Sequence, residues 1–146
     1  ALEKFTSLKK LMINSCVCLI DNSLKAIGNL TQLTHLELTG TYPSLSANAM
    51  TELKNLINLE YLNLDHNISV TDDCLIDIAL YCRKLNYLDI SGCGAITDRS
   101  MVNLSSLPKL ETLVMNWVNQ VTDESLSNLQ YLRVLKCWDC QLIQDQ

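Results

Sequence analysis

The chain has 146 residues, of which 48% are hydrophobic and only 5% aromatic, and its formal net charge is −5. This length suits one compact domain or one short array of repeats, and aliphatic side chains must fill the core because Phe5 is the only phenylalanine. The acidic charge argues against binding a nucleic-acid backbone, which needs clustered Lys and Arg, and against docking on an anionic membrane.

Six short strands are predicted along the chain, each followed by a turn and the start of a helix. Apolar and polar residues alternate in every predicted strand, which is typical of a strand with one buried face. The strands are expected near residues 10–13, 35–38, 61–64, 87–90, 112–115 and 134–137.

A helix start is predicted after each strand. An apolar residue followed by Ser, Thr or Asp indicates a helix N-terminus, because the side-chain oxygen accepts an otherwise unpaired backbone N–H. These signatures begin at Ile20, Leu45, Val70, Ile96, Val121 and Ile143. Apolar residues then recur at helical spacing, as in Met101, Leu104 and Leu107, so the helices are expected to form an outer layer.

One leucine pattern, L-x-x-L-x-L-x-x-(N/C), is repeated along the whole sequence. Its six copies start near residues 8, 33, 59, 85, 110 and 132, which are 25, 26, 26, 25 and 22 residues apart. Self-similarity at this period predicts an α/β fold, a right-handed parallel β/α solenoid of about six repeats that curves into an arc. We interpret residues 1–146 as one such array, and because neither end carries a recognisable polar cap, we expect a fragment of a longer protein.

The last position of the pattern is expected to face inward where the chain leaves the strand. Its six residues are Cys16, Thr41, Asn67, Cys93, Val118 and Cys140. Backbone amides lose their sheet partners there, so a small side chain that can hydrogen-bond to the turn is favoured. Thr41 and Val118 depart from the pattern, and we expect their two turns to be less regular.

The fourth copy resembles a known repeat family. The residues Cys93-Gly94-Ala95-Ile96-Thr97-Asp98, preceded by Cys82-x-x-Leu85-x-x-Leu88-x-Ile90, resemble the cysteine-containing subclass of leucine-rich repeats in the ribonuclease-inhibitor-like superfamily. The resemblance extends over the array and implies a leucine-rich-repeat horseshoe. This subclass is typical of F-box substrate receptors of SCF ubiquitin ligases, in which the horseshoe binds the substrate and a separate F-box recruits the ligase adaptor.

The resemblance therefore implies a protein–protein interaction module, the substrate-binding repeat region of an F-box-type ubiquitin-ligase adaptor. The sequence itself holds no F-box-like segment, so the SCF adaptor would be bound through a domain outside it. The subclass also occurs in repeat proteins that lack an F-box. The alternative is accordingly a structural or scaffold subunit, or a bacterial effector interaction module, with no link to ubiquitin.

No residue pattern predicts catalysis, a cofactor or a metal site. Cys137-x-x-Cys140 resembles a redox or zinc pair, but both cysteines occupy inward positions of the repeat, and a zinc site needs a second pair. His35 and His66 lie in adjacent repeats without a nucleophile motif, although Asp65 stands beside His66. We expect a protein that is not an enzyme.

The seven cysteines are explained without disulfides, which indicates a reducing compartment, the cytoplasm or the nucleus. Most of them fill inward positions of the repeat. Cys18 and Cys74 fit no repeat position, and they are either small apolar residues or mildly reactive thiols. No apolar run reaches the roughly 18 residues that a membrane-spanning helix needs.

The residues between the leucines of each strand are expected to point onto the concave face. The candidate partner-binding residues are His35, Glu37, Tyr61, Asn63, Asp65, Tyr87, Asp89, Trp117 and Trp138. Tyr61 should lie beside Tyr87, with an acidic strip next to them, and exposed Tyr and Trp are favoured interface anchors. Either these strands are simply solvated, or this face binds a protein segment that carries Lys or Arg and an apolar or aromatic anchor.

Overall fold

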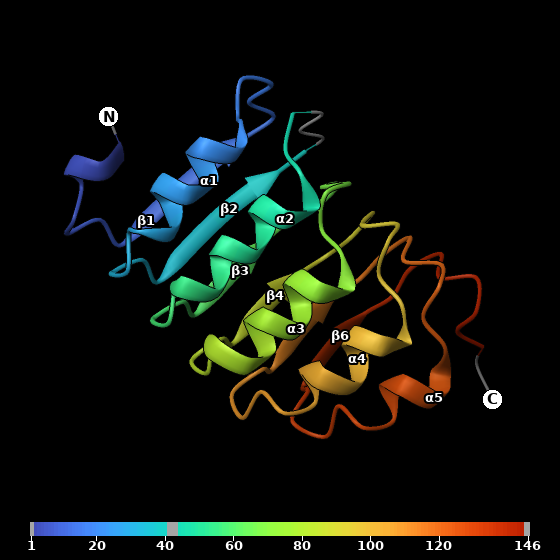
Figure 1. The fold of residues 1–146 in the computed structure, drawn as a ribbon. Helices are drawn as coiled ribbons and strands as arrows, with labels where there is room; N and C mark the ends of the chain where they lie inside the picture. The colour runs from blue at the N-terminus through green and yellow to red at the C-terminus, as the bar shows by residue number, and fades with distance from the viewer. Residues whose placement is uncertain (1, 41–43, 145–146) are drawn as a thin grey trace.

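The computed structural model describes residues 2–40 and 44–144. In this part of the chain, parallel strands form one sheet in the order β1-β2-β3-β4-β5-β6, so each strand lies beside its neighbours in sequence (Figure 1). The strands are β1 (Lys10–Asn14), β2 (His35–Thr39), β3 (Tyr61–Asn63), β4 (Tyr87–Asp89), β5 (Thr112–Val114) and β6 (Val134–Lys136). The helical segments are η1 (Leu2–Lys4), α1 (Asp21–Gly28), α2 (Ala47–Met50), η2 (Thr51–Asn55), α3 (Asp72–Tyr81), α4 (Asp98–Leu104) and α5 (Asp123–Leu126). The predicted α/β solenoid with six strands is confirmed.

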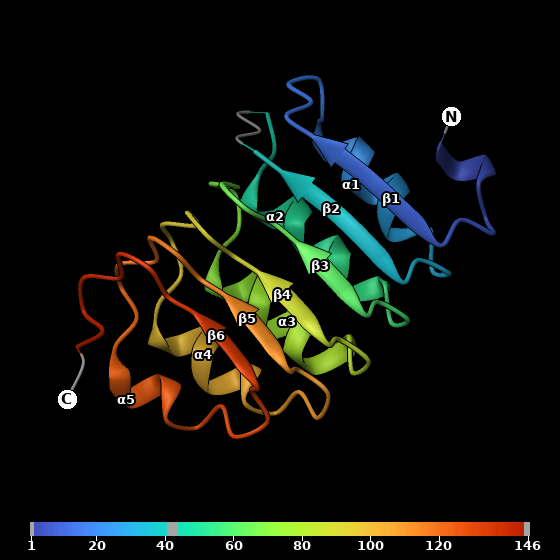
Figure 2. The same cartoon turned by 180° about the vertical axis from the view of Figure 1, so that it is seen from behind.

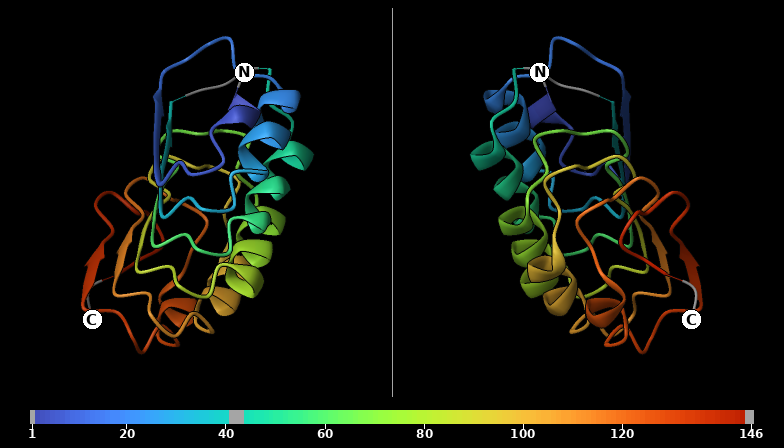
Figure 3. Two further views of the ribbon diagram at one scale, coloured as in Figure 1. Left: turned by 90° about the vertical axis from the view of Figure 1, so that its left-hand side faces the viewer. Right: turned by 90° about the vertical axis from the view of Figure 1, so that its right-hand side faces the viewer.

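The sheet and the helices form two layers. Figure 3 shows the strands on one side of the array and α1 to α5 on the other, and the array bends toward the sheet. Figure 2 looks onto the sheet, whose open face carries no helix in the described part of the chain. Parallel sheets are usually covered on both faces, so this bare concave face is the surface that the fold leaves open to a partner.

Leucines at equivalent strand positions stack through the array and form its core. Leu36, Leu62, Leu88 and Leu113 are paired in register from strand to strand, and all four are 0% exposed. Leu135 occupies the same position in β6 and was predicted to be interior, but it is 41% exposed. Within the described residues β6 has a neighbouring strand on one side only, and a repeat buries its apolar residues only between two neighbours.

The last position of the repeat pattern is buried, as predicted, at Asn67, Cys93, Val118 and Cys140, whereas Cys16 in the first copy is partly buried. The thiol of Cys93 donates to the carbonyl oxygen of Leu64 in the preceding repeat, with a sulfur–oxygen distance of 3.3 Å. Asn67 Oδ1 accepts the backbone N–H of Ser69 at 3.2 Å. Both side chains therefore satisfy backbone groups that have no partner in the sheet.

The turn at Val118 is less regular than the other described turns, as predicted. The backbone N–H groups of Leu19, Val70, Ile96 and Ile143 each donate to the carbonyl oxygen of the turn residue three positions before, whereas Val121 makes no such bond to Val118. Val118 is fully buried, and its backbone N–H donates to the carbonyl oxygen of Met115 at 3.3 Å. Asn67 makes the equivalent bond to Leu64 at 3.1 Å. The main chain alone closes this turn, so an apolar side chain can fill the buried position. Thr41, the other departure from the pattern, lies outside the described residues.

Aspartates at the starts of the helices join successive repeats. Asp72, the first residue of α3, accepts the backbone N–H of Thr97 at 2.9 Å and its hydroxyl at 2.6 Å. Asp98 accepts the same two bonds from Thr122 at 2.8 and 2.9 Å. Thr97 and Thr122 each precede a helix, so each carboxylate fixes the start of the next helix. The sequence pattern identified these residues as helix starts but not as links between repeats.

The row of aspartates is interrupted at α2, where a different hydrogen bond joins the two repeats. Ala47 begins α2 and offers no carboxylate to the next repeat. The hydroxyl of Ser69 instead donates to the carbonyl oxygen of Leu45 at 2.7 Å, which joins the same two repeats.

Hydrogen bonds lower the pKa of two aspartates in this row. Burial acts to raise the pKa of Asp98, but the bonds from Ser125 and Thr122 outweigh it and hold the pKa below its ordinary value. The pKa of Asp21 is lowered by the backbone N–H of Ser46 and then by its hydroxyl, both at 2.8 Å. The folded protein therefore favours the charged form of both carboxyl groups.

Asp72→Ala should lower the free energy of unfolding by roughly 2 to 3 kcal/mol, because it removes the charged acceptor of two hydrogen bonds. Urea titration followed by circular dichroism measures this loss. Asp73→Ala is the matched control: Asp73 pairs with Arg99 at the surface, where their side chains are 69% and 63% exposed. An exposed pair should contribute less than about 1 kcal/mol. Equal losses in the two variants would contradict the role of Asp72.

The acid stability of the protein should depend on Asp98. A folded-state pKa below the unfolded value of about 3.9 means that stability is present above that pH and is lost as the pH falls through the lowered pKa. The free energy of unfolding of Asp98→Asn should therefore change less between about pH 5 and pH 2 than that of the wild type. Urea titrations across this range measure both, and parallel curves would show that Asp98 does not contribute.

Candidate functional site

Three aromatic rings stack across β2, β3 and β4 on the concave face. The ring centroids of His35 and Tyr61 are 3.9 Å apart with their planes at 3°, and those of Tyr61 and Tyr87 are 4.3 Å apart at 6°. The three residues are paired in register, and neighbouring strands lie about 4.8 Å apart, so the sheet itself produces the stack. Because the ring faces cover one another, the stack offers a partner mainly its ring edges and hydroxyl groups.

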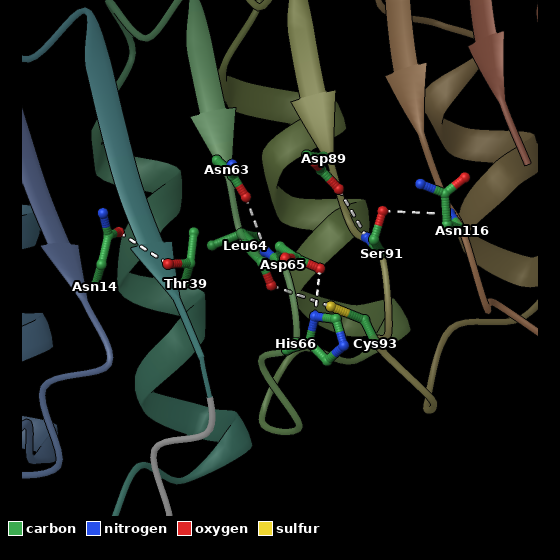
Figure 4. A network of polar contacts seen from close by, with 10 residues as sticks. All are labelled: Asn14, Thr39, Asn63, Leu64, Asp65, His66, Asp89, Ser91, Cys93 and Asn116. Atoms are coloured by element: carbon green, nitrogen blue, oxygen red, sulfur yellow. Dashed lines mark hydrogen bonds and ion pairs between the residues drawn. The ribbon is translucent and has the colours of Figure 1, made fainter. Parts of the chain in front are cut away.

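An acidic strip, formed by Glu37, Asn63 and Asp89, runs beside these rings as predicted. The sheet register pairs Glu37 with Asn63 and Asn63 with Asp89. Glu37 Oε1 lies 3.5 Å from His35 Nε2. Asp89 Oδ1 accepts the backbone N–H of Ser91 at 2.9 Å, which fixes the carboxyl group at the end of its strand (Figure 4).

The charged form of Asp89 is disfavoured by its partial burial. Burial raises the pKa of Asp89; hydrogen bonds from Ser91 oppose this effect, the charge of Asp65 adds to it, and Lys136 opposes it. A carboxylate that has lost part of its hydration gains most from a cation brought by a partner.

A carboxyl-edge cluster, formed by Asp65, His66, Gly92, Trp117 and Trp138, lies where the strands end. His66 Nδ1 is 2.6 Å from Asp65 Oδ1, a contact drawn in Figure 4. The ring centroids of His66 and Trp117 are 5.6 Å apart, and those of Trp117 and Trp138 are 5.4 Å apart in an edge-to-face arrangement. Trp138 is 70% exposed. Indole faces beside a carboxylate suit a cationic or aromatic group of a partner.

One backbone conformation, repeated in all six copies, positions this cluster. In each copy, the residue one place before the last position of the pattern turns the chain away from the sheet and has a positive φ. These residues are Ser15, Gly40, His66, Gly92, Trp117 and Asp139, with φ of 55°, 106°, 57°, 65°, 59° and 54°. This left-handed conformation is uncommon for residues other than glycine. Its sequence signal, glycine at the same place in two copies, was available but was not used.

Backbone hydrogen bonds between repeats hold the residues in that conformation. The N–H of His66 donates to the carbonyl oxygen of Ser91 at 2.7 Å, and the N–H of Trp117 donates to that of Trp138 at 2.9 Å. Gly92 lies between them, where an added Cβ would approach the ring of His66 to 3.1 Å. The absence of a side chain at Gly92 therefore lets the His66 ring lie against the backbone, next to Trp117.

An open depression, which we call the amino-edge depression, lies at the beginnings of the strands and was not predicted. Its volume is about 430 Å³. It is lined by Lys10, Thr34, His35, Glu60, Tyr61, Lys84, Asn86, Tyr87 and Lys109. The prediction considered residues within and just after the strands, whereas Lys84 and Lys109 precede theirs.

The nine predicted site residues all lie on the concave face, and none is fully buried. They form two groups. The first is the ring stack with the acidic strip, and the second is the carboxyl-edge cluster, which also includes His66. Two further residues expected on this face are buried instead: Ser91 is 3% exposed and Val114 is 5% exposed. Ser91 Oγ accepts the backbone N–H of Asn116 at 3.2 Å, and Val114 lies between its sheet neighbours Asp89 and Lys136.

The seven cysteines are free thiols that differ in burial. Burial raises the pKa of Cys74, and it raises the pKa of Cys82 and Cys93 to about 12. Cys18 is exposed. The structure thus separates the two cysteines that the sequence left unassigned, since Cys74 is fully buried with its thiol protonated.

Residues 2–40 and 44–144 hold neither a cluster of metal ligands nor a membrane-spanning helix. No three His, Cys, Asp or Glu residues of this region come together as metal ligands. None of its helices has the length and apolar character needed to cross a membrane.

No protein-family model matches the sequence. The chain is 29% identical over 146 residues to the Caenorhabditis elegans protein named "Putative RNA-binding protein EEED8.10", an alignment that covers 94% of this chain and 20% of that protein. Among solved structures it is similar to the crystal structure of the Rad7 and Elc1 complex in yeast, with a TM-score of 0.83, 22% identity, and coverage of 95% of this chain and 38% of that one. It is also similar to internalin C2 of Listeria monocytogenes, with a TM-score of 0.76, 27% identity, and coverage of 99% and 57%.

These similarities confirm the leucine-rich-repeat fold. They do not distinguish the cysteine-containing subclass from other leucine-rich repeats. The chain spans about a fifth of the curated relative's length and between a third and three fifths of the two structural neighbours.

A thiol-reactive dye such as Ellman's reagent should label Cys18 in the folded protein, whereas Cys74, Cys82 and Cys93 should react only after unfolding. The thiolate is the reactive form, and burial disfavours it at these three positions. The time course of labelling with and without urea measures this difference. Cys18→Ser should reduce the fast phase, and rapid labelling of the buried three would contradict the core described above.

Proposed function

We propose that this repeat array is a protein-interaction module whose concave face receives a protein segment carrying Lys or Arg together with an apolar or aromatic side chain. The observation that carries the proposal is the arrangement of exposed aromatic rings beside carboxylates on a sheet face that no helix covers. Asp65 and Asp89 supply negative charge, while Trp117 and Trp138 supply aromatic surface. Interfaces favour aromatic residues as anchors, and opposite charges select the partner.

The tryptophans give the strongest support. Trp117 and Trp138 are 38% and 70% exposed, although their size would favour burial if stability alone determined their place. Their rings meet edge to face, which leaves ring surface accessible beside Asp65 and His66. A guanidinium group stacked on an indole ring and paired with a carboxylate would use both features at once.

A protein is a better partner for this face than a nucleic acid. The net charge of −5 and the acidic strip would repel a phosphate backbone over the middle of the sheet. The name of the Caenorhabditis elegans relative describes a protein of which this chain matches 20%. The concave face offers aromatic and charged side chains for binding, and we propose that the protein acts by binding and not by catalysis.

We further propose that the array is the substrate-binding region of an F-box-type ubiquitin-ligase adaptor that acts in the cytoplasm or nucleus. The cysteine-containing repeat pattern, the free thiols and the fold shared with Rad7, crystallised with Elc1, support this assignment. The second candidate is a scaffold or effector module without a ubiquitin link, which the similarity to internalin C2 favours. Co-purification of the full-length protein with the SCF adaptor would support the first, and its absence from that complex would favour the second.

Three substitutions test the concave face: Tyr87→Ala, Asp89→Lys and Trp138→Ala. Peptides selected on the wild-type protein by display should be enriched in Lys or Arg and should bind each variant about tenfold more weakly or worse, since anchors typically cost about 2 kcal/mol when truncated. Fluorescence anisotropy gives the affinities, and circular dichroism gives the melting temperatures, which Trp138→Ala should barely change.

Val102→Ala is the matched control for these variants. Val102 is an exposed apolar residue on α4, 54% exposed and on the other layer of the array. Its truncation should leave peptide affinity unchanged. If Val102→Ala weakened binding while the three concave variants did not, the helical layer rather than the sheet would bind the partner.

A further inference from the structure

The amino-edge depression differs in charge from the rest of the concave face. Lys10, Lys84 and Lys109 line it together with a single carboxylate, that of Glu60. In the described part of the chain, none of the three ammonium groups is among the ion pairs formed with Asp or Glu. The depression thus has an excess of two positive charges that the fold does not neutralise.

Sheet geometry brings two of these lysines together. Lys84 and Lys109 each stand immediately before the first leucine of their repeats, Leu85 and Leu110. Equivalent positions in adjacent repeats lie about one strand spacing apart, roughly 4.8 Å. Lys84 Nζ donates to Asn58 Oδ1 at 2.7 Å, which holds the ammonium group in place and leaves it further hydrogen atoms to donate.

The neutral residues of the depression add hydrogen-bond donors rather than further charge. Asn86, Tyr61 and Tyr87 line it, whereas the hydroxyl of Thr34, which also lines it, already donates to the carbonyl oxygen of Lys9 at 3.2 Å. Burial, followed by the charge of Asp89, raises the pKa of Tyr87, so its hydroxyl group stays protonated and can donate. Ammonium groups combined with neutral donors form a suitable site for an oxyanion.

We infer that the amino-edge depression binds a phosphoryl group carried on a side chain of the partner segment. A phosphorylated Ser, Thr or Tyr has a charge of about −1.5 to −2 at neutral pH and three acceptor oxygens. This charge matches the excess of two positive charges, which a carboxylate with one charge would leave half neutralised. The inference rests on the proposed function, because it concerns a second position on the same bound segment.

The neighbouring acidic strip determines which phosphorylated partner fits. Glu37, Asn63 and Asp89 lie two residues further along the strands that carry His35, Tyr61 and Tyr87, a distance of about 6 to 7 Å. A segment with a phosphoryl group at one point and Lys or Arg nearby matches this change of charge. A nucleic acid would bring further phosphates against Glu37 and Asp89. The rings of the stack also cover one another, so they offer few free faces to bases.

The test uses small probes followed by NMR of the isotopically labelled protein. N-acetyl-O-phosphoserine amide should shift the backbone signals of Lys84, Asn86, Tyr87 and Lys109, whereas unphosphorylated N-acetylserine amide should not. The double variant Lys84→Ala/Lys109→Ala should weaken this binding roughly tenfold or more, which corresponds to about 1.4 kcal/mol. Lys25→Ala is the matched control, because Lys25 is an exposed lysine on α1, and it should bind like the wild type.

Two further probes distinguish the sources of the phosphoryl group. Inorganic phosphate should bind more weakly than the phosphoserine derivative, and equal or tighter binding would overturn the inference in favour of free phosphate. A ten-nucleotide oligouridylate should bind no more tightly than the phosphoserine derivative, and tighter binding that requires Lys84 and Lys109 would assign the depression to RNA. Shifts that are absent, or unchanged in the double variant, would also overturn it.

This experiment and the peptide experiment can fail separately. The probes contain neither a basic residue nor an aromatic anchor, so their binding does not require the acidic strip or the carboxyl-edge cluster. If the concave-face variants lose peptide binding but phosphoserine binding does not depend on the two lysines, the proposed function stands and the depression is rejected as its second position. If phosphoserine binds through the two lysines but the concave-face variants leave peptide affinity unchanged, the depression is an oxyanion site and the proposed peptide-binding surface is rejected.

Discussion

Equivalent residues of successive repeats are held side by side by the in-register pairing of six parallel strands. This pairing places Leu36, Leu62 and Leu88 in one buried row. It also places His35, Tyr61 and Tyr87 in one half-buried row on the opposite face, close enough for their rings to stack. Because side chains alternate between the two faces of a strand, a shift of one residue in any pairing would exchange the core for the binding face.

Polar contacts between repeats reinforce this register beyond the carboxyl ends of the strands. The carboxylates of Asp72 and Asp98 bind the residues that precede the next helices. At the turns, residues in the left-handed conformation donate backbone N–H groups to the following repeat. Each unit therefore depends on its neighbours for hydrogen bonds as well as for apolar burial, as expected for a solenoid.

The same pairing sorts charge on the concave face. Three lysines and one carboxylate gather at the beginnings of the strands, further carboxylates lie along and after the strands, and aromatic rings occur at both ends. A segment bound along the strands would contact the amino-edge depression, then the acidic strip and then the carboxyl-edge cluster. Specificity would then come from the order of its charged and aromatic groups rather than from any single contact.

The sequence was sufficient to predict the repeat, the strand positions, most of the inward leucines and a set of nine residues that share one face. These follow from local period, since alternation within a strand and a spacing near 25 residues between copies leave one way to stack the units. The exposure of Trp117 and Trp138 also followed, because neither occupies a leucine position. The less regular turn at Val118 followed as well, because valine cannot hydrogen-bond to the turn. The prediction failed at Leu135, which has a neighbouring strand on one side only among the described residues.

Contacts between residues far apart in sequence were decided by the tertiary structure. Asp72 reads locally as a helix start, but its carboxylate binds Thr97, 25 positions later, because stacking brings successive helix starts together. Lys84 and Lys109 are unremarkable residues before two strands until the sheet places them around one depression. Periodicity thus determined which face each side chain occupies, whereas the curvature and stacking of the repeats decided which side chains from different repeats share a site.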